Sequence, residues 1–211
     1  MQKKWQRARQ LIRLCIGQFL TLLPNDPLFN RWRLAWWQRQ GYSFGAGCSI
    51  QSSVKFKGDI IMGNGCSLSN NVFLAASGGG RIVFGDYVMV GPNSVVVAFT
   101  HGTTPSRPMV LQKTIGKDIV VQDDVWIGAN CTITPGVHIG RGSIIGAGAV
   151  VTSNIPAYSI AVGAPARVIG QRGAPMPSAT VDSPDSIADA TAAASQLSHQ
   201  RDTFAEGDKD D

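Results

Sequence analysis

The chain carries aliphatic side chains at every sixth position between residues 115 and 151. We call the residues at these positions markers: Ile115, Val121, Ile127, Ile133, Ile139, Ile145 and Val151. An amphipathic helix repeats its apolar face every 3.6 residues and a half-buried strand every 2 residues, so neither produces this interval. A chain that turns a corner after each short strand does produce it. The pattern therefore predicts a parallel β-helix.

Two other positions of the six-residue unit support this prediction. The position two residues before each marker holds a small or modest side chain that suits a narrow interior: Val125, Cys131, Val137, Ser143 and Ala149. The position three residues after each marker holds a residue that tolerates a tight or left-handed turn: Asp118, Asp124, Asn130, Gly136, Gly142 and Gly148. Each unit is thus expected to form a strand of two or three residues and a corner, and three units complete one triangular coil.

The same phase continues upstream with two interruptions. Its earlier markers are Ile50, Phe56, Met62, Leu68, Leu74, Phe84, Val90 and Val96. The first interruption falls in Ser77-Gly78-Gly79-Gly80, which predicts a bulge or small loop. The second skips the repeat between Val96 and Ile115 and predicts a loop extruded from the coil at about residues 99–114. Loops on a rigid scaffold commonly carry function.

These residues resemble the hexapeptide-repeat acyltransferases, whose fold is a left-handed parallel β-helix, over about residues 45–170. The most specific matches are Asp124-Val125-Trp126-Ile127-Gly128-Ala129, Pro135-Gly136-Val137, Ile145-Gly146-Ala147-Gly148, Val151-Thr152, Ile155-Pro156 and the segment 162–169. The pattern is most similar to the group that contains maltose, galactoside and bacterial polysaccharide O-acetyltransferases. Hexapeptide repeats are themselves a recognised sequence signature of β-helices.

The two ends of the chain differ in charge from the repeat region. Residues 1–40 carry eight Lys or Arg against one Asp, whereas residues 171–211 carry three against eight Asp or Glu. Such opposite ends, without a recognition helix or zinc-finger spacing, argue against nucleic-acid binding. We therefore expect a basic amphipathic helical segment at 1–44, the β-helix domain at 45–170, and an acidic, low-complexity, disordered tail at 171–211.

The basic N-terminal segment has two interpretations. Its apolar run from Leu11 to Leu23 is too short for a transmembrane helix and lacks the cleavage site of a signal peptide. The segment either caps the first coil of the solenoid or serves as an interfacial anchor on an anionic membrane, and the two roles are compatible. Trp32, Trp36 and Trp37 fit both interpretations. We expect a cytoplasmic protein, peripheral at the inner face of the cell membrane if the anchor operates.

Cysteine placement gives no sign of a metal or redox site. Cys48, Cys66 and Cys131 share the interior position two residues before a marker, which predicts small buried side chains. Cys15 belongs to the N-terminal segment. No pair has metal-ligand spacing, so we predict no metal and no disulfide, consistent with a reducing cytoplasm.

His101 is the candidate catalytic residue. Acetyl transfer from a thioester to a hydroxyl needs a base of near-neutral pKa, and imidazole meets that need. His101 begins the extruded loop directly after a repeat strand, where the resemblance places the catalytic histidine. His138 is expected on the outer surface, and His199 lies in the tail.

The resemblance also implies a site for acetyl-CoA and one for the acceptor. The implied coenzyme A contacts are Trp126, Ala129, Ala147, Thr152 and Arg167, along a groove between neighbouring subunits. The implied acceptor contacts are Asn93 and Arg107. The sequence departs from the family pattern in two places. Ala75-Ala76-Ser77 stands where the family has an acidic acceptor-binding residue. Ser153 and Gly170 stand where it has basic residues, and Arg172 is a candidate substitute for these.

The sequence predicts an acetyl-CoA-dependent O-acetyltransferase of a sugar hydroxyl in surface polysaccharide biosynthesis. We expect direct transfer with His101 as general base, in a homotrimer whose active sites lie between subunits. The alternatives are an N-acetyltransferase of a nucleotide-amino-sugar or serine, and a non-catalytic β-helix scaffold. A γ-class carbonic anhydrase would share the fold but needs three histidine ligands, and the repeat region holds only His101 and His138.

Overall fold

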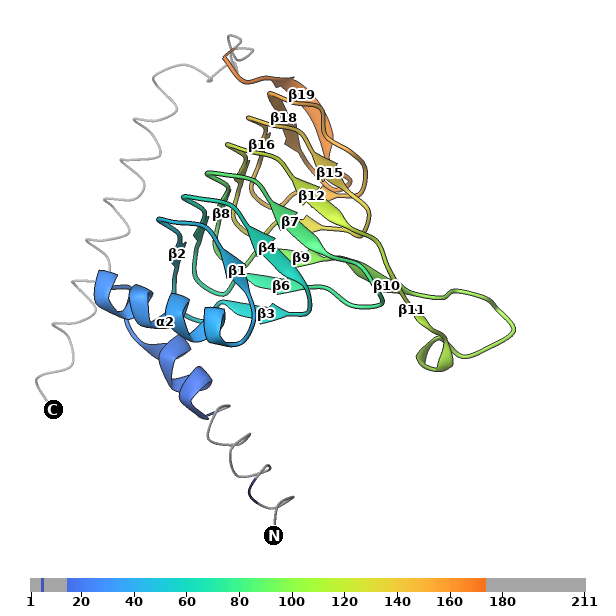
Figure 1. The fold of residues 1–211 in the computed structure, drawn as a ribbon. Helices are drawn as coiled ribbons and strands as arrows, with labels where there is room; N and C mark the ends of the chain where they lie inside the picture. The colour runs from blue at the N-terminus through green and yellow to red at the C-terminus, as the bar shows by residue number, and fades with distance from the viewer. Residues whose placement is uncertain (1–4, 6–14, 174–211) are drawn as a thin grey trace, which may run out of the picture. The chain divides into compact units, whose positions relative to one another are not determined.

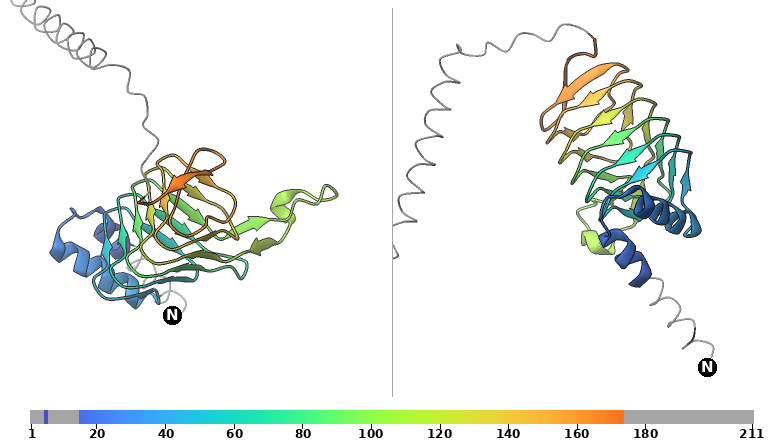
Figure 2. Two further views of the ribbon diagram at one scale, coloured as in Figure 1. Left: turned by 90° about the horizontal axis from the view of Figure 1, so that it is seen from above. Right: turned by 90° about the vertical axis from the view of Figure 1, so that its left-hand side faces the viewer.

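Three parallel sheets form the faces of a triangular β-helix in the computed structural model, which describes residue 5 and residues 15–173 (Figures 1 and 2). Sheet A contains β1 (Ser43–Phe44), β4 (Ile60–Met62), β7 (Ile82–Phe84), β12 (Ile119–Val121) and β15 (His138–Ile139). Sheet B contains β2 (Ser49–Ile50), β5 (Ser67–Leu68), β8 (Met89–Val90), β13 (Trp126–Ile127), β16 (Ile144–Ile145), β18 (Ser159–Val162) and the antiparallel β19 (Arg167–Gln171). Sheet C contains β3 (Lys55–Lys57), β6 (Phe73–Ala75), β9 (Val95–Val97), β14 (Thr132–Ile133) and β17 (Val150–Val151). The predicted hexapeptide-repeat β-helix is confirmed.

The marker residues stack on one another inside the solenoid. Ile127, for example, pairs in register with Val90 below and Ile145 above, and all three are buried. Five of the six predicted corner positions adopt left-handed backbone, with φ of 57° at Asp124, 55° at Asn130 and 67° at Gly142, whereas Asp118 does not. The three interior cysteines are buried, and burial raises the pKa of the Cys131 thiol. The repeat therefore builds a continuous aliphatic core.

Ile115 is an exception, because its assignment as a marker of the coil was wrong. Its side chain is 45% exposed, and the residue lies in β11 (Thr114–Gly116), opposite Thr100. The chain re-enters the coil only at Asp118, whose carboxylate accepts hydrogen bonds from the backbone and guanidinium of Arg81 at 2.9 and 2.8 Å. Counting in sixes cannot locate this re-entry, since Ile115 stands six residues before the buried Val121 although it lies in the arm strand.

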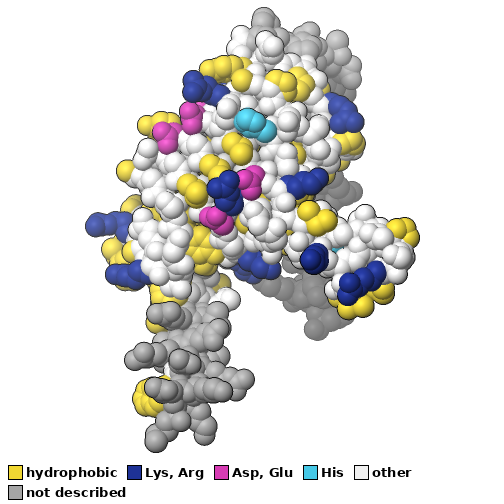
Figure 3. All heavy atoms as spheres, turned by 45° about the vertical axis from the view of Figure 1, so that its right-hand side comes forward, with side chains coloured by type: hydrophobic (Ala, Val, Ile, Leu, Met, Phe, Trp, Pro, Cys, Tyr) yellow, Lys and Arg dark blue, Asp and Glu magenta, His cyan; other side chains and the backbone are white. Residues whose placement is uncertain are grey.

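The extruded loop is an ordered arm that leaves the corner between sheets C and A. Its two strands, β10 (Phe99–His101) and β11, are antiparallel, and the 3-10 helix η1 (Met109–Leu111) lies near its tip. Figure 3 shows basic and hydrophobic side chains gathered on this projection. We refer to residues 99–116 as the arm.

The two interruptions of the repeat contact each other at the base of the arm. The amide of Gly116 donates to the carbonyl of Gly78 over 3.1 Å, and a Cβ at Gly116 would collide with the backbone nitrogen of Gly80. The amide of Lys117 donates to the carbonyl of Ala98 over 3.0 Å. The glycine-rich bulge thus provides the space in which the arm returns to the coil.

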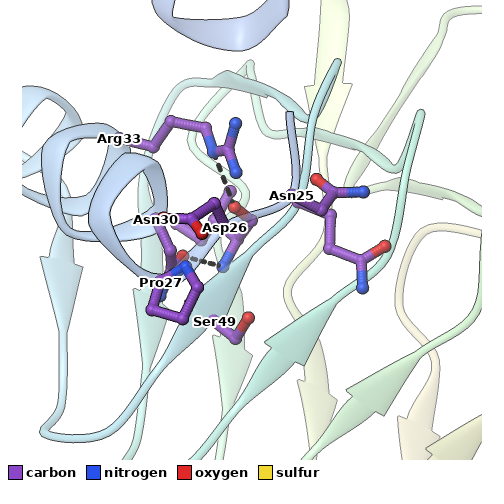
Figure 4. A pocket seen from close by; sticks show the side chains of 8 residues that line it. Asn25, Asp26, Pro27, Asn30, Arg33 and Ser49 are labelled. Carbon is purple, nitrogen blue, oxygen red and sulfur yellow. Dashed lines mark hydrogen bonds between the residues drawn. The ribbon is translucent and has the colours of Figure 1, made fainter. Parts of the chain in front are cut away.

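Helix α2 (Pro27–Arg39) covers the first coil. Asp26 caps its N-terminus by accepting a hydrogen bond from the amide of Leu28. Asn30 and the buried Arg33 bond to the backbone of β2, which would otherwise be an open sheet edge: Asn30 accepts from the Ile50 amide and the Arg33 Nε donates to the Ile50 carbonyl (Figure 4). A cavity of about 290 Å³ lies beside these bonds. Asn30 and Arg33 therefore supply the partners that a preceding coil would supply.

The rest of α2 completes the lower end of the core. The indole of Trp37 packs edge-on against the rings of Tyr42 and Phe56, with centroids 5.5 and 5.0 Å away. A second helical stretch, residues 15–22, precedes α2. Within the described part of the chain, no helix is long and apolar enough to cross a membrane. The predicted features of residues 6–14 and of the tail from residue 174 lie outside the described residues.

Candidate functional site

His101 lies at the end of β10, where the arm leaves the solenoid. Its backbone is fixed by pairing with Thr114, and its side chain is exposed. The His101 ring stands edge-on to the ring of Phe99, with centroids 6.4 Å apart. The histidine therefore combines an ordered backbone with a side chain free to meet a substrate.

Phe99 links His101 to the outer surface of sheet C. The Lys57 ammonium lies 5.7 Å from the centroid of the Phe99 ring, within the range of a cation–π contact. Lys57 belongs to β3, so the side of β10 that carries Phe99 and His101 faces sheet C. The Phe99 ring thus lies between the His101 ring and the Lys57 ammonium of sheet C.

A cavity of about 450 Å³ borders the same sheet at its opposite edge. Residues 15–22 and the first two coils line it: Gln18, Thr21, Leu22, Ser53, Lys55, Asn71, Val72 and Phe73. Lys55 and Lys57 stand two residues apart on β3, about 7 Å, and both are exposed. Lys57 therefore lies between Lys55, which lines the cavity, and Phe99, whose ring contacts His101. The cavity lining combines an aromatic ring with amide, hydroxyl and ammonium groups.

Three of the predicted site residues, Asn93, Ala129 and Ala147, lie along the corner between sheets B and C, and Asn93 is the one next to this cavity. Asn71, in the cavity wall, donates from its side-chain nitrogen to the Asn93 side-chain oxygen over 3.1 Å. The corner continues upward through Ala129 and Ala147, where the amide of Gly148 donates to the Ala129 carbonyl over 2.8 Å. A column of small side chains leads from Asn93 along the solenoid, leaving room for a ligand to approach the backbone closely.

The other predicted residues lie elsewhere on the solenoid. Trp126 is half-exposed on sheet B, and Thr152 follows β17 at the corner between sheets C and A. Arg167 begins β19, and its guanidinium donates to the carbonyl of its neighbour Ala166 over 2.9 Å. Arg107 is exposed on the arm. One chain therefore does not bring all of them together, because sheets B and C face different directions.

Arg172 is held by a partner within its own chain. Its Nη1 donates to the Asp124 carboxylate over 2.6 Å and to the Gly142 carbonyl over 3.3 Å. Its suggested role in binding phosphate would therefore require breaking an ion pair.

Sequence reasoning missed Gln112, which fixes the arm. Its side-chain amide donates to the carbonyls of Thr104 and Arg107 over 2.9 and 2.7 Å, and its oxygen accepts from the Thr104 amide over 3.0 Å. Glutamines in loops are common, so no motif marked this residue. Lys57 and Phe73 were also missed, because outward-facing positions of a repeat carry no signal of their own.

We expect Gln112→Ala to loosen the arm without unfolding the solenoid. Three hydrogen bonds are lost from a segment outside the core, so the arm should sample conformations that move its residues away from sheet C. Hydrogen exchange of the amides at residues 102–112 should rise at least tenfold while those of β12 and β13 stay unchanged. Lys113→Ala, next in the chain, is the control. Equal exchange in the two variants would remove Gln112 from this role.

Groupings that could hold a metal ion are not found among the described residues, since no three His, Cys, Asp or Glu side chains converge there.

Comparisons with known proteins agree with this architecture. Residues 118–153 match the family model described as bacterial transferase hexapeptide (six repeats). The chain is similar in structure to a hexapeptide-repeat-containing acetyltransferase of Vibrio cholerae that was solved in complex with acetyl-CoA. The two are 31% identical in sequence with a TM-score of 0.62, and the match covers 74% of this chain and 84% of that one.

Two curated relatives match shorter stretches. The galactoside O-acetyltransferase of Lactococcus lactis is 40% identical over 88 residues, or 41% of this chain and 42% of the relative. A 2,3,4,5-tetrahydropyridine-2,6-dicarboxylate N-acetyltransferase of Staphylococcus aureus is 44% identical over 62 residues, or 29% of this chain and 26% of the relative. The chain thus spans less than half the length of either.

Proposed function

Because this chain belongs to the hexapeptide-repeat acyltransferase family, we propose that it is an acetyl-CoA-dependent O-acetyltransferase that acts on a sugar hydroxyl. The observation that carries the proposal is the arrangement around sheet C. The His101 ring contacts Phe99, which lies against Lys57 on one side of the sheet. The cavity lined by Lys55, Asn71 and Phe73 borders the other side. Aromatic, amide and ammonium groups suit a saccharide, which offers apolar ring faces and many hydroxyls. A surface polysaccharide or its lipid-linked precursor is the acceptor we propose.

In the proposed mechanism, His101 acts as the general base. It accepts the proton of the sugar hydroxyl while that oxygen attacks the thioester carbonyl, so that the new C–O bond forms as the C–S bond breaks. The imidazolium then returns the proton to the departing thiolate. Backbone N–H groups are suited to stabilise the tetrahedral oxyanion. The transfer is direct and uses no covalent enzyme intermediate.

The donor site in this proposal lies between subunits of a homotrimer. Within one chain, Trp126 and Arg167 lie on sheet B, whereas His101 borders sheet C. A second copy that presents its sheet B side to this sheet C surface would bring the two sets together. The outer side chains of sheet C include the half-buried Val95, Val97 and Val150, which suit such a contact. Coenzyme A would then extend along Ala129 and Ala147, with Thr152 and Arg167 towards its ends and Arg107 and Asn93 towards the acceptor.

N-acetylation is the second candidate, favoured by the match to the Staphylococcus aureus N-acetyltransferase. The two functions differ in the acceptor atom, which the cavity lining does not select. Free-thiol release from acetyl-CoA, followed with oligosaccharides, nucleotide-amino-sugars and serine, separates them. Turnover with a hydroxyl acceptor supports the proposal, and turnover with an amine alone replaces it by the second candidate. No turnover together with no coenzyme A binding by calorimetry would favour a non-catalytic scaffold.

Phe73→Ala should weaken acceptor binding selectively. Loss of an aromatic contact of about 0.5–1.5 kcal/mol predicts an acceptor KM raised about two- to tenfold, with the KM for acetyl-CoA unchanged. Ile61→Ala, which removes an outward apolar side chain from sheet A instead of sheet C, is the matched control. If both variants raise the acceptor KM equally, the cavity is not the acceptor site.

A further inference from the structure

Helix α2 has two chemically different faces, and only one of them covers the solenoid. Asn30, Arg33 and Trp37 point to the first coil. On the opposite face, Leu28 and Trp32 are each 49% exposed. The capping role therefore leaves an apolar face of α2 open to solvent.

The preceding helical residues, 15–22, are placed in the same way. Gly17 lies against the Trp36 indole, where a Cβ would come within 3.1 Å of the ring nitrogen, and the Thr21 carbonyl accepts from the Ser53 amide over 2.7 Å. These contacts leave Ile16, Phe19 and Leu22 exposed by 42, 62 and 73%. Exposed apolar side chains from two helices thus occur together at one end of the molecule. We call Ile16, Phe19, Leu22, Leu28 and Trp32 the N-terminal apolar surface.

The charge around this surface indicates what covers it. Arg31 and Arg39 are exposed on α2, and the first 40 residues carry eight Lys or Arg against one Asp. A second copy would place two positively charged surfaces against each other, and these would repel. An anionic bilayer would instead attract the positive charge. Tryptophan beside arginine is also the composition of segments that lie in a membrane interface.

We propose that the N-terminal apolar surface docks on an anionic lipid bilayer, with Phe19 and Trp32 entering the interface and Arg31 and Arg39 contacting lipid phosphates. Capping and docking then use opposite faces of α2 and operate together. The proposal concerns attachment only and stands independently of which acceptor is acetylated.

The test is co-sedimentation of the full chain with phosphatidylglycerol-containing vesicles and with pure phosphatidylcholine vesicles. We expect binding to the anionic vesicles that falls steeply in 1 M salt, where the Debye length is about 3 Å. Arg31→Gln with Arg39→Gln should lower the partition coefficient about 25-fold, since each basic residue near the surface contributes about fivefold. Phe19→Ser with Trp32→Ser should lower it about tenfold or more.

Tyr87→Ser is the matched control, because Tyr87 is an equally exposed aromatic residue, on the corner between sheets A and B. It should bind vesicles as the parent chain does. Unchanged thermal unfolding of each variant shows that the fold is intact. The proposal is overturned if neutral and anionic vesicles bind alike, if neither binds, or if the Tyr87 variant loses binding as the double variants do. If the parent chain does not bind vesicles and the Phe19→Ser, Trp32→Ser variant forms a smaller oligomer than the parent, then a second copy of the chain covers the N-terminal apolar surface.

Discussion

His101→Gln should lower kcat by about 10² to 10⁴ while leaving coenzyme A binding intact, because general-base assistance contributes a factor of that size. Glutamine has a similar length and can hydrogen-bond, but it cannot accept a proton at neutral pH. The His101 side chain is exposed and makes no contact with the core, so the solenoid should unfold at the parent temperature. The measurement is free-thiol release with a saturating acceptor, together with calorimetric titration of coenzyme A.

His138→Gln is the control for this experiment. His138 is also an exposed histidine on a β-helix strand, but it lies on sheet A, away from the sheet C surface. It should retain full activity. If both histidine variants keep the parent rate, the base is another group; if both lose it, the effect is not specific to the arm.

The repeat made the solenoid predictable almost residue by residue. Buried markers such as Val121 and Ile145 and left-handed corners such as Asn130 follow from short-range spacing, which the sequence displays directly. The same reasoning failed at Ile115, because spacing alone cannot distinguish a strand in the coil from a strand in the arm. It also gave no hint that Gly80 and Gly116, 36 residues apart, meet at the arm's base.

The candidate site was only partly predictable for a related reason. His101 could be identified because it stands at the boundary between repeat and loop. Lys57 and Phe73 could not, since they reach the site through the stacking of coils rather than through any local pattern. Their outward positions look the same as those of solvent-exposed residues in every other repeat unit.

Arg33→Met should destabilise the N-terminal end of the solenoid by about 3 kcal/mol. The guanidinium donates to the carbonyls of Ile50, Leu23 and Pro24 over 2.9 to 3.3 Å, and methionine would leave these acceptors without a donor. Burial lowers the pKa of Arg33, but a guanidinium stays protonated at neutral pH. Methionine also avoids the cost of burying a charge. This gain offsets part of the penalty, and the figure of about 3 kcal/mol allows for it. Arg31→Met, on the exposed face of the same helix, should change stability by less than about 0.5 kcal/mol.

The destabilisation by Arg33→Met should be confined to the N-terminal coil and its helical cap, because each coil of a solenoid contacts only its neighbours. Hydrogen exchange reports this directly. The amides of Ile50, Ser52 and Ser53 donate to Asn30, Asn25 and Thr21, so they open when the helical cap detaches. In Arg33→Met their exchange should accelerate about 100-fold, the equivalent of about 3 kcal/mol, while amides of β13 and β16 keep the parent rate. If the Arg33 and Arg31 variants exchange equally at these amides, the buried arginine does not hold the cap. Acceleration along the whole solenoid would instead mean that cap and coils unfold as one cooperative unit.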